Sequence, residues 1–415
     1  MEAADKDRND AAAPWAGPAG ERPSPIAVFR AFLKLGVSSF GGPVAHLGYF
    51  REEFVVRRKW IHEHAYANVV GLCQFLPGPA SSQVAFSIGL MHSGYWGAFA
   101  AWSGFTLPSA IGLVLFAHGA TALDGPAGLG LLHGLKLVAV AIVAQAVWGM
   151  ARTLCPDRQR AFIAAIAALM ILFSASSAAQ MGAIAVGGVA GVWLCRNVEA
   201  ARSGHIAMPV SRTAGVVALV GFFSLLAGLP VLRASIASPG VASFEAFYRS
   251  GALVFGGGHV VLPLLRQSFI TPGWVSEDLF LAGYGAAQAI PGPLFTFAAY
   301  LGAVMNPAPH GIAGAMLGLI AIFLPGILIL IGMLPFWDAF GKRTNAQAMM
   351  RGVNAAVVGL LGAALYTSIW TPTVQAPGDF VVALIGFVLL TVWRSPPLFV
   401  VIISAIGGVA LALIN

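Results

Sequence analysis

The sequence is short of charge, and this shortage limits the class of protein. Only 9% of its 415 residues are charged, whereas 58% are hydrophobic and the mean hydropathy is +0.82. A soluble domain carries about 25% charged residues, so a chain this poor in charge cannot cover a water-facing surface of its own. The composition therefore predicts a protein whose main solvent is the lipid bilayer.

Cysteine and clustered charge are also scarce. Cys73, Cys155 and Cys195 lie far apart and predict neither a disulfide framework nor a zinc site. The net charge of +7 comes without a dense lysine and arginine run, which excludes a nucleic-acid-binding protein. The positive-inside rule accounts for a basic excess, and the alternative is a bias towards anionic cargo. No cofactor is expected, and neither metal-ligand spacing nor a buried carboxylate pair indicates an enzyme.

Apolar segments fill the chain from residue 26 onwards without an intervening soluble domain. We expect a disordered cytoplasmic tail at 1–25, because this stretch lacks the apolar core of a signal peptide. An N-terminal membrane repeat follows at 26–195, then a linker at 196–240 with one transmembrane helix at 214–232, and a C-terminal membrane repeat at 241–415. Each repeat holds about six apolar elements, which predicts an all-α polytopic membrane protein.

The two repeats share spaced identities along more than 100 residues. At an offset of 215, Phe29, Phe32, Gly36, Phe40, Gly41 and Gly42 recur as Phe244, Phe247, Gly251, Phe255, Gly256 and Gly257. At an offset of 214, Trp60, Glu63, Gln74, Pro77, Gly78 and Pro79 recur as Trp274, Glu277, Gln288, Pro291, Gly292 and Pro293. Pro108 also matches Pro325, and Gly134 matches Gly352. The chain therefore contains an internal duplication.

The lone helix at 214–232 predicts that the second repeat is inverted. If each repeat has an even number of crossings, this helix turns the second repeat upside down, an architecture common among transporters. The basic loop Arg51–Lys59 has an equivalent that holds only Arg266. Because lysine and arginine mark cytoplasmic loops, this swap of charge favours opposite orientations of the two repeats.

Elements one and two of each repeat have a Gly or Pro break near the middle. Element two spans Glu63–Met91 with its break at Pro77–Pro79. Each arm has roughly 13 residues, or about 18–20 Å at 1.5 Å per residue. Half of a ~30 Å hydrocarbon core is about 15 Å, so a re-entrant hairpin whose tip reaches the midplane fits. Thirteen full crossings are the simpler alternative, and they keep the same inversion.

The Pro-Gly-Pro breaks are the most specific motif. Two prolines around a glycine interrupt a helix, so a half-helix begins at membrane depth with free N–H groups and a positive dipole end. Such an end binds anions, and a structural kink is the alternative interpretation. The candidate residues of this motif are Gln74, Pro77, Gly78, Pro79, Ala80, Ser81 and Ser82 in the first repeat and Gln288, Pro291, Gly292, Pro293 and Thr296 in the second.

A glycine motif and several cations complete the candidate anion site. Glycine pairs let backbone approach a ligand closely, although close helix packing is the alternative. This motif supplies Ser38, Ser39, Gly41, Gly42 and His46, with Gly256, Gly257 and His259 in the second repeat. Charged residues inside a membrane usually face a cavity or a partner, which adds Arg30, Lys34, Arg249 and Lys136, with snorkelling to the interface as the alternative.

At three runs the chain resembles the chromate ion transporter family: Phe40–Phe50 (FGGPVAHLGYF), Leu72–Gln83 (LCQFLPGPASSQ) and Ala101–Ala110 (AWSGFTLPSA). The resemblance covers both halves, so the chain is similar to the long, two-domain members. It implies export of chromate dianion across the bacterial inner membrane, and hence chromate resistance, with sulfate as the natural competitor. Two positions depart from the pattern: Gly258 replaces Pro43 of the first half, and His92 stands where family members often have a basic residue.

We expect alternating access, with the dianion held between the two Pro-Gly-Pro breaks while the hairpins move against the rest. Uptake or exchange of sulfate or another oxyanion on the same fold is the alternative function, and a membrane-embedded enzyme is the third. The expected partners are the oxyanion and the lipid bilayer, and the sequence leaves a homodimer open.

Overall fold

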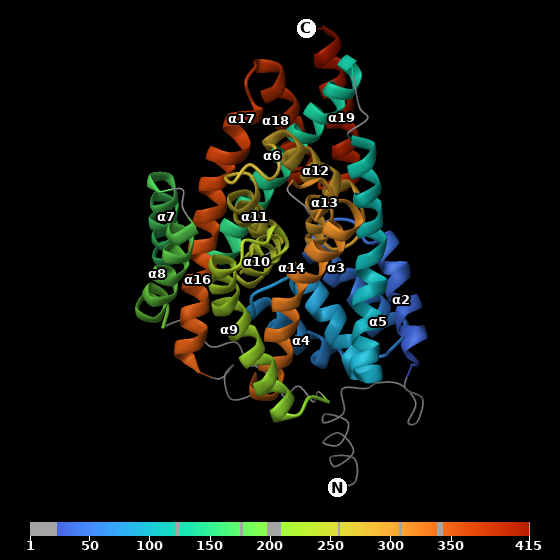
Figure 1. Cartoon of the computed structure of the whole chain (residues 1–415), viewed down its shortest axis with the longest axis vertical. Coiled ribbons are helices and arrows are strands. Elements are labelled where there is room, and N and C mark those ends of the chain that lie inside the picture. Colours follow the sequence, from blue (N-terminus) through green and yellow to red (C-terminus); the bar gives the residue numbers. More distant parts are fainter. Residues whose placement is uncertain are drawn as a thin grey trace.

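The structure, a computed structural model, describes residues 23–120, 125–174, 177–196, 209–255, 258–306, 309–337 and 343–414, which contain helices and no β-strand (Figure 1). Within these ranges six helices are long and apolar enough to cross a membrane. The predicted all-α polytopic membrane fold is therefore confirmed. Most of the predicted tail, part of the linker, Gly256 and Gly257 lie outside the described residues.

The helices follow the apolar elements of the sequence. The first repeat contains α2 (Pro25–Ser38), α3 (Gly42–Phe50), the π-helix η1 (Arg51–Arg57), α4 (Glu63–Phe75), α5 (Ala80–Ala120), α6 (Gly125–Leu154), α7 (Arg158–Phe173) and α8 (Ser177–Leu194). Serine or aspartate side chains accept a backbone N–H at the starts of α2 and α7, and also of the linking helix α9 (Arg212–Ser235). Such caps satisfy one of the free donors of a first turn.

The second repeat repeats this order. It contains α10 (Pro239–Ala252), η2 (Gly258–Val260), α11 (Val261–Phe269), α12 (Glu277–Ala289), η3 (Leu294–Thr296), α13 (Phe297–Val304), α14 (Gly311–Met333), η4 (Leu334–Phe336), α16 (Thr344–Ala364), η5 (Leu365–Trp370), α17 (Thr371–Thr373), α18 (Pro377–Thr391) and α19 (Pro397–Ile414). One difference concerns α5, in which Ser93 and Gly94 have non-helical backbone angles. This kink divides α5 into a short arm before Ser93 and a long helix after Gly94.

Element one of each repeat folds back on itself as a helical hairpin. In the first repeat the ring of Phe32 on α2 lies 4.7 Å from that of Phe54, which follows the break and α3. The equivalent rings of Phe247 and Phe269 lie 4.3 Å apart in the second repeat. Residues on either side of each break therefore meet, as they do when the two arms run antiparallel.

Element two forms a hairpin as well. The base of the first closes where His92 Nε2 lies 3.1 Å from the Trp60 carbonyl oxygen, just before α4. In the second repeat the Asn306 N–H donates to the Trp274 carbonyl at 2.9 Å. Both ends of each hairpin therefore lie together, and the Pro-Gly-Pro break forms its tip.

The long part of α5 and its equivalent α14 run in opposite directions. Ala117 and His118, near the end of α5, line one pocket with His310, which precedes α14. Further back on α5, the Trp102 ring lies 5.6 Å from the Phe323 ring in the middle of α14. In Figure 1, α4 lies in the lower half of the view and its repeat equivalent α12 in the upper half.

The remaining helices are exchanged between the repeats. α6 packs against α18 and α19, whereas α16 packs against α7 and α8, which stand at the left edge of Figure 1. Glycines permit these close crossings. A Cβ on Gly134 would lie 2.4 Å from the Ser404 carbonyl oxygen, and one on its repeat partner Gly352 would lie 2.0 Å from the Gly187 oxygen.

We predict that Gly352→Val destabilises the protein by about 1–3 kcal/mol, since the new side chain must separate α16 from α8. The measurement is the thermal unfolding midpoint of purified protein. Gly228→Val on α9 is the matched control, because nothing lies within 4 Å of a Cβ at that position. Equal midpoints for the two variants would contradict the close crossing.

Candidate functional site

The breaks of the two repeats bind each other through backbone hydrogen bonds. The Gly78 N–H donates to the Val254 carbonyl at 2.8 Å, and the Gly292 N–H donates to the Ser39 carbonyl at 3.0 Å. Gly78 and Gly292 are repeat equivalents, as are Ser39 and Val254 at the offset of 215. Each Pro-Gly-Pro tip therefore docks on the element-one break of the opposite repeat, the reciprocal exchange that a pseudo-two-fold relation between the repeats predicts.

Glycine is required at both tips. The φ angles of Gly78 and Gly292 are +116° and +109°, a conformation that L side chains rarely adopt. Space is also lacking, because a Cβ on Gly78 would lie 3.0 Å from Gly326, and one on Gly292 would lie 2.7 Å from the Ser109 hydroxyl. The predicted breaks thus form the contact between the repeats.

α5 begins at the first tip, and its N-terminal turn is buried. Ser81 and Ser82 are each 3% exposed. His46 on α3 reaches this end of the helix, with Nδ1 at 3.4 Å from the Ser81 hydroxyl and Nε2 at 3.2 Å from the Ser39 carbonyl oxygen. The structure therefore brings together three predicted site residues from different elements, Ser39, His46 and Ser81.

Several buried polar atoms of the first element-one break and of α5 have no hydrogen-bond partner. They are the Ser39, Ser82 and Thr106 hydroxyl oxygens and Gln83 Oε1. Each of these side chains is at most 3% exposed. Buried polar groups are nearly always paired in proteins, so a cluster of unpaired ones beside a helix N-terminus suits a polar ligand.

Gln83 and Thr106 were missed as candidate residues by the sequence prediction. Both lie inside the family-like runs Leu72–Gln83 and Ala101–Ala110, which were the available signal. Gln83 Nε2 donates to the Pro77 and Gly326 carbonyls, each at 2.9 Å, and so connects the first tip to α14 of the second repeat. This geometry leaves Oε1 of the same amide as the unpaired atom.

Two of the predicted side chains at the second tip are paired with protein groups. The Thr296 hydroxyl donates to the Pro293 carbonyl at 2.7 Å, and His259 Nδ1 lies 2.7 Å from the Tyr284 hydroxyl. Gln288 Nε2 is buried without a partner. The structure gives Gly256 and Gly257 no description.

Other predicted residues lie at the edge of this region. Gln74 and Gly41 are exposed, and Ser38 is exposed while its hydroxyl donates to the Lys34 carbonyl at 2.8 Å. Gly41 and Gly42 have φ angles of +101° and +77°, which explains why glycines occupy the element-one break. Among the described residues no group of three His, Cys, Asp or Glu side chains is placed to hold a metal ion.

The structure pairs three of the four predicted cations with carboxylates away from the first tip. Lys34 lies 3.6 Å from Glu53, Lys136 lies 2.7 Å from Asp278, and Arg249 lies 2.9 Å from Glu245. Arg30 is exposed. The described geometry thus gathers hydroxyls and helix N–H groups at the first tip rather than these cations.

Glu53, the partner of Lys34, also forms ion pairs with two arginines. Burial alone would raise its pKa, but the hydrogen bond from Arg58 and the charges of Arg58, Lys34 and Arg57 lower the pKa of this carboxyl overall. Lys34 is therefore committed to a charge cluster at the base of the first hairpin.

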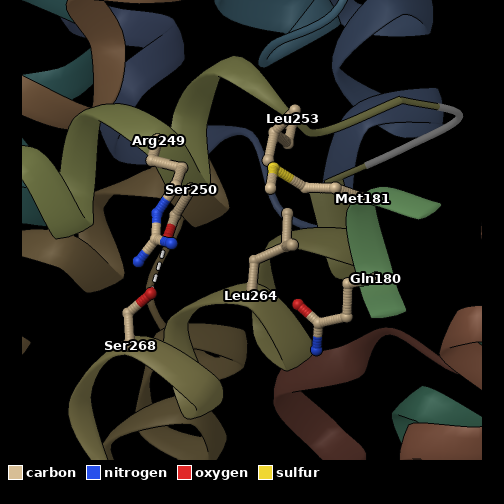
Figure 2. A pocket seen from close by; sticks show the side chains of 7 residues that line it. All are labelled: Gln180, Met181, Arg249, Ser250, Leu253, Leu264 and Ser268. Carbon is tan, nitrogen blue, oxygen red and sulfur yellow. Dashed lines mark hydrogen bonds between the residues drawn. The ribbon is translucent and has the colours of Figure 1, made fainter. Parts of the chain in front are cut away.

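Arg249 lines a small pocket beside the second element-one break (Figure 2). Ser250 and Ser268 lie next to it with their hydroxyls 3.4 Å apart, and Gln180 and Met181 of α8 lie across the pocket. Arg249 shares the Glu245 carboxylate with Arg233, which lies 2.9 Å from it. This pocket is distinct from the Pro-Gly-Pro tips.

We predict that Gln83→Leu lowers the free energy of unfolding by about 1–3 kcal/mol, because the buried Pro77 and Gly326 carbonyls lose their donor. Thermal unfolding of purified protein checks this. Gln375→Leu is the control, since Gln375 also donates to a proline carbonyl, that of Pro372, but is exposed. A Gln83→Leu midpoint as high as that of the control would show that the bridge contributes nothing.

Comparison with known proteins agrees with this architecture. The sequence matches the chromate transporter family over residues 26–192 and again over 241–409. The chromate transport protein of Pseudomonas aeruginosa is 28% identical over 393 residues, which cover 92% of this chain and 90% of that protein. The chromate transport protein of Cupriavidus metallidurans is 26% identical over 394 residues, with 92% of each chain covered. No solved structure matches the chain.

A shorter relative matches one part of the chain. The Bacillus subtilis protein YwrB, described as an uncharacterized transporter, is 30% identical over 171 residues, which cover 39% of this chain and 83% of that protein. Together with the two family matches and the apolar helices, these findings identify a multi-pass protein of the bacterial inner membrane. The chain belongs to the chromate transporter family, whose members are transporters rather than enzymes.

Proposed function

We propose that the protein exports chromate from the cytoplasm by alternating access and thereby confers chromate resistance. One observation carries this proposal: unpaired, buried hydroxyls surround the N-terminus of α5 where the breaks of the two repeats meet. The names of the Pseudomonas and Cupriavidus relatives supply the substrate.

The chemistry of the first tip suits a tetrahedral oxyanion. An anion accepts hydrogen bonds, and the N-terminus of α5 offers the Ser81 and Ser82 N–H groups with the positive end of the helix dipole. Hydroxyls can donate as well, so the Ser82 and Thr106 groups that lack partners in the protein would gain them from the anion. Hydrogen bonds to a charged group are stronger than neutral ones. They would compensate the anion for the hydration that it loses on entering the site.

Inverted repeats would give the two access states of the cycle. The antiparallel α5 and α14 and the reciprocal tip contacts support this inversion. Ion pairs join the two hairpins within each repeat, Arg51 to Glu63 at 2.8 Å and Arg266 to Glu277 at 2.6 Å. We infer that each hairpin pair moves as a unit against the exchanged helices α6 and α16.

The membrane potential favours export. Moving one negative charge out of a negative-inside cell releases about 2.3 kcal/mol per 100 mV, and a dianion releases about twice that. Export of the dianion alone can therefore be driven by the membrane potential without an additional energy source.

We predict that inside-out vesicles containing the protein accumulate chromate and that sulfate competes. Ser82→Ala removes a buried hydroxyl that has no partner in the protein and should lower the initial rate about tenfold, since one hydrogen bond to a charged ligand contributes about 1.5–3 kcal/mol. Ser235→Ala, an exposed serine at the end of α9, is the control and should leave the rate unchanged.

Three other outcomes would oppose the proposal. Vesicles that take up sulfate but no chromate would favour a sulfate carrier on this fold. Uptake only into right-side-out vesicles would reverse the direction. A Ser82→Ala rate equal to that of Ser235→Ala would remove the first tip from the substrate path.

We predict opposite membrane faces for the two hairpin bases. Glu52→Cys and Thr271→Cys place one thiol on the exposed loop region of each repeat, in a background where Cys73, Cys155 and Cys195 are replaced by serine. A membrane-impermeant maleimide applied to whole cells should label position 271 and not position 52, and both after lysis. Labelling of both positions in intact cells would exclude the inverted arrangement.

A further inference from the structure

The internal duplication allows the environment of the first tip to be compared with its own counterpart in the second repeat. The two tip glycines make equivalent backbone hydrogen bonds, although the second tip leads into the 3₁₀ turn η3 rather than directly into an α-helix. Each tip glycine also packs on equivalent positions of the long helices, Gly78 on Gly326 and Gly292 on Ser109. Positions in the two repeats can therefore be paired one to one around the tips.

The side chains at these paired positions differ in polarity. At offsets of 214 to 217, Ser39, Ser81, Gln83 and Thr106 correspond to Val254, Phe295, Phe297 and Phe323. Every one of these eight side chains is at most 3% exposed. At these four positions the first repeat is polar and the second is apolar, whereas Ser82 corresponds to Thr296, another hydroxyl side chain, whose hydroxyl is paired with the Pro293 carbonyl.

The second repeat shows what fills the space when no ligand is needed. The rings of Phe295 and Phe323 pack against each other with centroids 5.7 Å apart. Their counterparts, Ser81 and Thr106, are much smaller, and the Thr106 hydroxyl has no partner. The two positions that carry packed aromatic rings in the second repeat thus carry small hydroxyl side chains in the first.

We infer that each chain has one oxyanion site, that it lies off the pseudo-two-fold axis in the first repeat, and that Thr106 binds the anion opposite Ser81. This inference rests on the proposed oxyanion transport and assigns the site to one repeat. The Phe295 and Phe323 pair closes the equivalent place in the second repeat. The Thr106 hydroxyl donates to the anion and thereby gains its missing partner.

An unpaired hydroxyl predicts an unusual combination of effects. Thr106→Val keeps the shape of the side chain and removes a buried polar group that has no partner in the protein, so the variant should unfold at the same temperature or higher. Its chromate transport rate in proteoliposomes should fall about tenfold or more, the effect of one hydrogen bond to a charged ligand. Thr106→Ser, which retains the hydroxyl, should transport at a rate close to that of the parent protein.

The matched control is Ser404→Ala. Ser404 on α19 is 1% exposed and its hydroxyl is also unpaired, but it lies at the crossing with α6. This variant should also unfold at the same temperature or higher, with unchanged transport. Added chromate should raise the unfolding temperature of the parent protein and of Ser404→Ala, because ligands stabilise the state that binds them, and should do so much less for Thr106→Val.

The outcomes separate the two proposals. If the parent protein neither transports chromate nor gains stability from it, the proposed function fails. If the parent does both and Thr106→Val matches it, the assignment of Thr106 is overturned while chromate transport stands. A Thr106→Val protein that unfolds at a lower temperature, without a lost chromate response, would show that the hydroxyl serves the fold.

Discussion

The architecture depends on how the backbone N–H groups at two interrupted helices find hydrogen-bond acceptors. Breaks at membrane depth expose N–H and C=O groups that lipid cannot satisfy. Here the Gly78 and Gly292 N–H groups donate to Val254 and Ser39, each in the break of the other repeat. Because neither repeat can satisfy its own tip in this way, the two must meet. That meeting places the N-terminus of α5 in the protein interior, far from competing water, where a helix dipole acts strongly on a bound anion.

The two tips make similar backbone contacts, but the side chains around them differ between the repeats. Glycines keep the contacts of both tips alike, whereas the polar groups Ser39, Gln83 and Thr106 occur on one side only. Unpaired polar groups cost stability when they are buried, so the unpaired Ser39 and Thr106 hydroxyls agree with a role in binding an anion, whereas Gln83 Oε1 can only accept a hydrogen bond and Gln83 serves the bridge to α14. The apolar side then contributes packing, with Phe323 in contact with both Phe295 and Trp102. In a duplicated fold, one repeat can thus bind the ligand while the equivalent region of the other repeat contributes apolar packing.

Local chemistry explains which features the sequence could predict. The breaks at Pro77–Pro79 and Pro291–Pro293 follow from residues that cannot continue a helix, and the repeat follows from spaced identities. The contacts of the tips depend on segments far apart in the chain, so Val254 could not be named as the partner of Gly78. Lys34 and Lys136 were predicted as site cations from their apolar surroundings, but their carboxylate partners Glu53 and Asp278 lie on other elements. Element two was predicted to end at Met91, and the kink at Ser93 and Gly94 lies just after it.

The exchange of helices between the repeats has a consequence for biogenesis. α6 packs on α18 and α19, and α16 packs on α7 and α8, so each half leaves unfilled grooves that only the other half can occupy. Until the ribosome has made the second half, α6, α7 and α8 lack the helices on which they finally pack. Their glycine-containing faces are then exposed to lipid or to membrane chaperones. A polypeptide that contained only one of the two halves could make these contacts only if a second polypeptide supplied the partner helices, and its assembly would then depend on how much of each was synthesised.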